Sequence, residues 1–177
     1  MDYVDNGKGL MVPDSGVKTK GVWHGYHVRD GKIIDEWEDT NVTTNQGLNH
    51  MLNVEFASAT PITAWYVGVF SGNYVPLSTD TGANIVANAT EATGYTSATR
   101  PAWVNAGASS QAISNAASLA TFTFNATLSI YGAFLISTAT KSDTAGTLYA
   151  AAQFSTVKNV VSSDQLLLNY QVSLTSS

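Results

Sequence analysis

The chain has 177 residues, a net charge of −5 and no cysteine. This length fits one domain with a sizeable core, and the lack of cysteine excludes disulfides and thiolate metal sites. The eight basic residues are scattered, which argues against a nucleic-acid partner, because binding phosphates needs clustered Lys and Arg. No run of about 18 apolar residues occurs, so we expect no membrane-spanning helix. The first residues, Met1–Gly7, lack the basic and apolar regions of a signal peptide.

The distribution of charge is more informative than its sum. Only 12% of the residues are charged, against about 25% in a typical globular domain. Residues 1–55 hold 14 of the charged side chains and residues 56–177 hold seven. The surface of the second segment is therefore expected to be neutral and polar, which is less costly to desolvate than ions and suits extensive subunit contacts. The alternative is a secreted or surface-exposed β-protein with a neutral coat.

Residues 1–20 are predicted to form an extended N-terminal arm. They contain glycines and Pro13 but no apolar periodicity, so the segment cannot bury a face of its own. It is either a frayed terminus or a segment that becomes ordered on a neighbouring subunit. In the second case Tyr3, Val4 and Met11 are candidate interface residues, and deleting the arm should leave folding intact but abolish attachment.

Residues 21–43 are predicted to form a β-hairpin. Two runs rich in β-branched and aromatic residues flank Asp30-Gly31, a preferred pair for a two-residue type I′ turn. Trp23, Tyr26 and Trp37 lie in these strands and are candidate interface residues if the hairpin stands away from the body. The favoured interpretation is that the tryptophans pack onto the core, since they alternate with polar residues.

The rest of the chain predicts one short helix and several strands in a single domain over 21–177. The helix is expected at 44–56, capped by Thr44 or Asn45, with an apolar stripe of Leu48, Met51, Leu52 and Phe56. A fully buried strand is expected at 65–70 and a long loop at 71–88. Further extended segments are expected at 100–104, 111–115, 120–125, 130–137, 148–154 and 165–174. The fold class is all-β, an antiparallel sandwich or jelly-roll-like domain.

The sequence predicts no catalytic site, no cofactor and no metal. His24 and His27 are three residues apart on a strand, so they should face opposite sides. The acidic run of Asp35, Glu36, Glu38 and Asp39 could hold calcium or act as a pair of catalytic carboxylates. The favoured interpretation is a solvated edge strand whose charges prevent uncontrolled pairing.

Several phrases of the sequence resemble a family of small tailed-phage and prophage proteins. The resemblance spans roughly residues 20–175 and lies in the segments Thr44–Val54, Ile62–Phe70, Glu91–Trp103, Gly132–Leu135 and Gly146–Ala150. It implies a structural protein of the virion, and no functional residue carries over from it. Proteins of this kind occur in several parts of the virion, so the location stays open.

Among virion roles, the first expectation is a capsid decoration or cement protein. Its partners would be the major capsid protein and sister copies in a homo-oligomer, without nucleic acid or membrane. Such a protein would be made in the host cytoplasm and lie on the outer capsid surface. The second expectation is a tail, baseplate or fibre component, in which the 71–88 loop or the Trp23/Trp37 hairpin would meet a host sugar. A small β-sandwich hydrolase or metal-dependent carbohydrate binder is the third.

Overall fold

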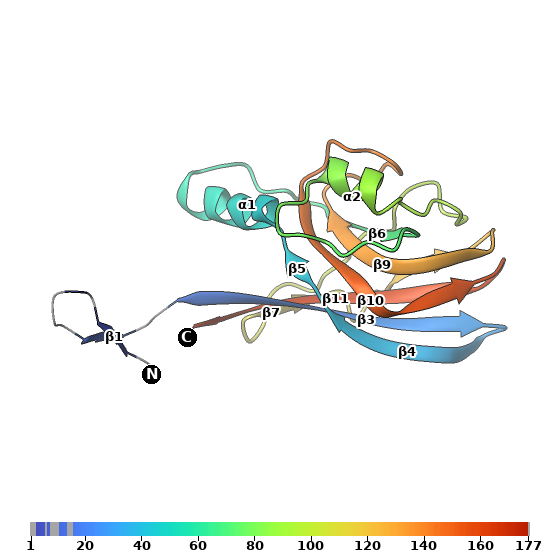
Figure 1. Ribbon diagram of the computed structural model, residues 1–177, viewed down its shortest axis with the longest axis horizontal. Helices are drawn as coiled ribbons and strands as arrows, with labels where there is room; N and C mark the ends of the chain where they lie inside the picture. Colours follow the sequence, from blue (N-terminus) through green and yellow to red (C-terminus); the bar gives the residue numbers. More distant parts are fainter. Residues whose placement is uncertain (1–2, 6, 8–10, 14–15, 177) are drawn as a thin grey trace.

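The computed structural model describes residues 3–5, 7, 11–13 and 16–176, and it consists mainly of two antiparallel sheets (Figure 1). One sheet has four strands in the order β5-β10-β9-β6; the other has the order β4-β3-β11-β7, and β8 also pairs with β11. The all-β, sandwich-like prediction is confirmed. The elements are β1 (Tyr3–Asp5), β2 (Met11–Pro13), β3 (Val17–Arg29), β4 (Lys32–Thr40), β5 (Val42–Thr43), α1 (Asn45–Phe56), β6 (Tyr66–Phe70), α2 (Gly82–Asn88), β7 (Ala112–Ser114), β8 (Ala120–Thr123), β9 (Leu128–Ile136), β10 (Leu148–Val160) and β11 (Gln165–Ser176).

Strand β3 lies between β4 and β11 in the five-stranded sheet. It pairs with β4 through the predicted turn, where Asp30 and Gly31 have φ angles of 49° and 73°, the left-handed values that a type I′ turn requires. On its other side β3 pairs with β11 from Val28 to Val17, which lies opposite Ser176. The last strand therefore pairs within its own chain. The same pairing makes β3 begin at Val17, so the first four residues of the strand belong to the segment expected to be the arm.

The main core lies between the two sheets. It contains Trp23 from β3, Phe122 from β8, Leu135 from β9 and Tyr170 from β11. The rings of Trp23 and Tyr170 have centroids 4.6 Å apart. These aromatic side chains pack between the two sheets. Burying each large ring removes about 150–250 Å² of surface from water.

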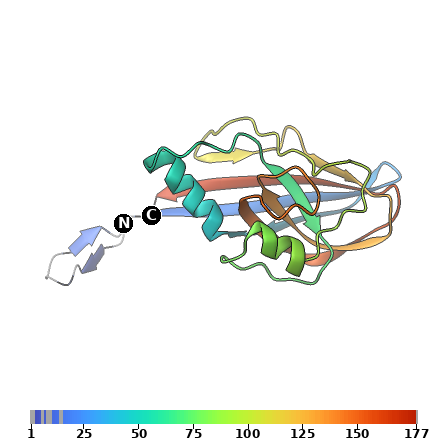
Figure 2. The ribbon, with the colours of Figure 1, turned by 90° about the horizontal axis from the view of Figure 1, so that it is seen from above.

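A second, smaller core explains why β6 is apolar on both faces. Val67 and Val69 belong to the main core, while Phe70 packs with Phe134 and with Ile85 of α2. Both helices lie on the same side of the molecule (Figure 2). The predicted loop over 71–88 is wrong in its last part, because two turns of helix cover the outer face of the four-stranded sheet. Thr81 caps α2 in a reciprocal capping box with Asn84.

The N-terminal segment is not simply extended. Strands β1 and β2 pair antiparallel, with Tyr3 opposite Pro13 and Asp5 opposite Met11. They form a two-stranded sheet of their own, which stands off the body at the end where β3 starts and β11 stops (Figures 1 and 2). We call the β1–β2 pair the N-terminal hairpin.

Candidate functional site

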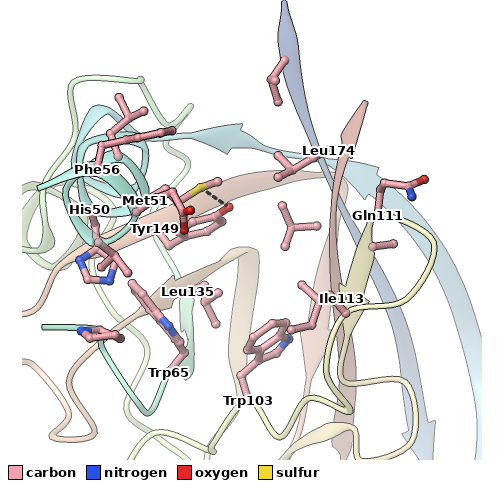
Figure 3. Close-up of a pocket in the computed structure, with 18 residues that line it drawn as sticks. His50, Met51, Phe56, Trp65, Trp103, Gln111, Ile113, Leu135, Tyr149 and Leu174 are labelled. Atoms are coloured by element: carbon pink, nitrogen blue, oxygen red, sulfur yellow. Dashed lines mark hydrogen bonds between the residues drawn. The ribbon is translucent and has the colours of Figure 1, made fainter. Parts of the chain in front are cut away.

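An apolar groove of about 730 Å³ lies between α1 and the ends of β3, β7 and β11 (Figure 3). It opens at the end of the sandwich from which the N-terminal hairpin projects, since Val17, the first residue of β3, is part of its wall. The residues that shape it are Met51, Trp65, Trp103, Ile113, Tyr149 and Leu174.

The floor of the groove is aromatic, and the polar atoms of Tyr149 and Trp103 are hydrogen-bonded within the fold. The rings of Trp65 and Tyr149 meet edge to face with centroids 5.6 Å apart. The Tyr149 hydroxyl donates to the sulfur of Met51 at 3.2 Å, and burial raises the pKa of this tyrosine to about 12. The indole N–H of Trp103 donates to the carbonyl of Tyr170 at 3.0 Å. The floor therefore presents mainly carbon, which suits apolar side chains.

The rim of the groove is unusually exposed. Phe56 is 81% exposed, Val17 73% and Leu52 56%. Leu52 and Phe56 belong to the predicted apolar stripe of α1, and both are exposed. Single exposed apolar side chains are ordinary, but here three of them line the same apolar groove.

The first turn of α1 fixes the helix to β10. Thr44 accepts a hydrogen bond from the N–H of Gly47 at 3.1 Å, which confirms Thr44 as the predicted cap. The side chain of Gln46 accepts from the N–H of Leu148 at 3.0 Å. A Cβ on Gly47 would lie 2.7 Å from the carbonyl oxygen of Tyr149, so only glycine allows this approach. With its start anchored, the rest of α1 forms one wall of the groove.

The structure corrects two of the candidate interface residues. Trp23 is 0% exposed and Trp37 is 8% exposed, so both are core residues. Gly25 makes room for the indole of Trp37, because a Cβ there would lie 2.3 Å from that ring. Tyr26 points to the other face of the sheet, where it is half-buried beside His24. Tyr3 and Val4 lie on β1 and Met11 lies on β2, the two strands of the N-terminal hairpin.

The acidic run lies on the expected edge strand, β4, but it is not uniformly solvated. Asp35 accepts from Lys158 at 2.8 Å, and both carboxylate oxygens of Asp39 accept from the backbone N–H of Ser155 at 3.1 Å. The β9–β10 register shifts between Gln153 and Lys158, which leaves backbone groups there without a ladder partner. Two of the four carboxylates therefore contact β10, although the Asp35 side chain stays 45% exposed.

A buried polar cluster joins β3 to the turn before β11. Asp164 accepts from Nε2 of His27 at 2.8 Å and from the two nitrogens Nε and Nη2 of Arg29 at 2.9 and 2.6 Å. The Arg29 guanidinium, with further donors from the Val161 N–H and His27, holds the pKa of Asp164 well below its usual range. His24 instead pairs with Glu36 on the outer face, so the two histidines face opposite sides as predicted.

Replacing Asp164 by asparagine is expected to destabilise the fold by about 1.5–3 kcal/mol, the range for hydrogen bonds to charged groups. Because the folded-state pKa is lowered, the contribution of Asp164 is fully present above its unfolded pKa of about 3.9 and is lost as the pH falls toward the folded value. Urea unfolding at pH 7 and pH 3 measures this: the difference between wild type and Asp164→Asn should shrink at pH 3. An equal difference at both pH values would contradict the ionic role.

No group of three or more His, Asp or Glu side chains that could hold a metal ion occurs in the described part of the chain. No helix among residues 3–5, 7, 11–13 and 16–176 is long and apolar enough to cross a membrane. A scan of protein-family models found no match to this chain, and a search of curated proteins found no significant match either.

Proposed function

We propose that this chain is a structural subunit of a tailed-phage virion, a capsid decoration protein that bridges capsid subunits through protein–protein contacts. The resemblance of its sequence phrases to phage proteins supports this role, and so does one structural observation. That observation is the near-absence of free charge on the surface formed by residues 56–177.

The seven charged side chains of this segment are all engaged within the fold. Lys158 and Asp164 make the contacts described above, and Arg100 is paired with Glu91 at 2.7 Å with both side chains at most 1% exposed. Asp80 accepts from the hydroxyl of Tyr74 at 2.8 Å. Lys141 donates to two backbone carbonyls, and Asp143 accepts from the N–H of Ala145. The sequence alone shows that charges are few; the structure shows that those present are used internally.

Such a surface lowers the cost of association. Bringing an ion out of water costs several kcal/mol even after relaxation, whereas a neutral hydroxyl or amide costs less and can find a hydrogen-bond partner across the interface. Many copies that each make a modest neutral contact then add up, because multivalency multiplies weak binding on a repeating shell. The charges of residues 17–55 lie mostly on β3 and β4, so the β3–β4 face is the part that stays in water.

New charges on the neutral surface test this proposal. Thr63→Glu and Thr79→Glu each place a carboxylate at an exposed site of the neutral segment, and Thr40→Glu places the same carboxylate on exposed β4 as a matched control. We expect at least one of the first two to weaken co-sedimentation with mature capsids tenfold or more, with the control within twofold. A tenfold loss corresponds to about 1.4 kcal/mol. Equal binding by all three variants would contradict the proposed surface.

A further inference from the structure

The pairing of β1 with β2 is too short to be stable by itself. Its two strands have three residues each and pair with one another in a separate two-stranded sheet. An isolated two-stranded hairpin is marginal in water, and further strands or a packing surface are needed to stabilise it. Its strand residues are mostly apolar: Tyr3, Val4, Met11, Val12 and Pro13. An apolar surface against which these residues pack would therefore stabilise the hairpin.

The groove is an apolar surface, and no segment among residues 16–176 fills it. Its floor is aromatic, and its rim exposes Leu52, Phe56 and Val17. Of its lining side chains only Glu55 carries a formal charge at pH 7 with histidine neutral, so the occupant it fits is apolar. The groove and the hairpin lie at the same end of the molecule, because Val17 both lines the groove and starts the strand that follows the hairpin (Figure 1).

We propose that the groove receives the N-terminal hairpin of a second copy of this chain. The hairpin of the same chain is directed away from it: β3 stays paired with β11 out to Val17 and Ser176, and the hairpin lies beyond that point (Figures 1 and 2). Each copy thus offers one hairpin and one groove, and exchange between copies closes into a symmetric homo-oligomer. This inference rests on the proposed function, and it names the sister copy as the partner of the arm.

Engineered cysteines test the exchange directly, because the chain has none of its own. Asp5→Cys lies on β1 and Glu55→Cys lies on the groove wall, and neither removes an apolar side chain. Purified single variants are mixed without capsids and treated with a short bismaleimide. We expect a linked two-chain product at least tenfold above that of a control mixture of Asp5→Cys with Thr79→Cys.

Two outcomes would overturn the inference. One is a product no greater than that of the control mixture. The other is a link within single chains of the Asp5→Cys/Glu55→Cys double variant together with no product on mixing, which would place the hairpin in the groove of its own chain.

The oligomeric mass gives an independent readout. Leu52→Glu/Phe56→Glu changes two exposed side chains and should preserve the fold, measured by circular dichroism, while the mass by light scattering falls to the 18.7 kDa of one chain. Deletion of residues 1–16 should do the same. Val75→Glu/Leu77→Glu, a matched pair of exposed apolar residues away from the groove, should keep the oligomer. A folded groove variant that retains the wild-type mass would contradict the exchange.

These assays separate the inference from the proposed function. They contain no capsid, so a chain that exchanges hairpins but binds no capsid would refute only the capsid role. A chain that binds capsids as a monomer with its hairpin free would refute only the exchange.

Discussion

Replacing Arg100 by methionine is expected to destabilise the protein by about 3–5 kcal/mol, because it leaves the buried carboxylate of Glu91 without its cation. The guanidinium donates to both oxygens of Glu91 at 2.7 and 2.8 Å and to the backbone carbonyls of Thr138 and Asp143 at 2.9 and 3.1 Å. It also lies over the ring of Phe134, 5.5 Å from the centroid. One side chain thus joins the segment that contains Glu91 to the loop after β9, 38 to 43 positions away from Arg100 in the sequence.

Urea unfolding of a double-mutant cycle measures this pair. Glu91→Leu leaves the guanidinium without a carboxylate, and Arg100→Met/Glu91→Leu removes both charges. We expect the double variant to lose clearly less stability than the sum of the single changes, since it leaves no buried ion unpaired. Additive losses would show that the charges do not depend on each other.

Replacing Trp23 by alanine is expected to cost about 3–5 kcal/mol, the range for removing a large aromatic side chain from a core. Trp23 is fully buried against Tyr170, and its indole nitrogen has no hydrogen-bond partner among the described residues. Trp23→Phe should therefore cost much less than Trp23→Ala, because it loses volume but no hydrogen bond.

Tyr26→Ala is the matched control, since Tyr26 lies on the same strand with its side chain on the opposite, half-exposed face. Urea unfolding should show the largest loss of stability for Trp23→Ala and a smaller loss for Trp23→Phe. The unfolding free energy of Tyr26→Ala should stay within about 1.5 kcal/mol of wild type. If Trp23→Ala kept wild-type stability, the tryptophan would not belong to the core.

Local signals explain which elements could be predicted from the sequence. The β3–β4 hairpin follows from Asp30-Gly31, whose backbone preference is set by two adjacent residues. The start of α1 follows from the side chain of Thr44, and the strand alternation around Phe122 and Phe124 follows from a two-residue period. Helix α2 was missed because it has only two turns, although Thr81 and Asn84 carry a capping-box pattern that could have shown it.

The groove and the use of the charges could not be predicted, because both depend on contacts between distant parts of the chain. His27 and Asp164 are 137 positions apart, and Asp35 and Lys158 are 123 apart. The stripe on α1 gave no sign that Leu52 and Phe56 stay exposed, since a helical period shows which residues share a face but not what covers that face. The apolar residues of the arm could be recognised in the sequence. The groove could not, because it forms only when β11 pairs with β3 and places the two ends of the chain at the same end of the fold.

Co-sedimentation of the purified protein with mature capsids that lack it, and separately with purified tails, distinguishes the decoration role from a tail role. We predict saturable binding to capsids, at a stoichiometry equal to the number of capsid subunits or a simple fraction of it. Binding to tails alone, or only a few copies per particle, would contradict the decoration role and move the protein to the tail.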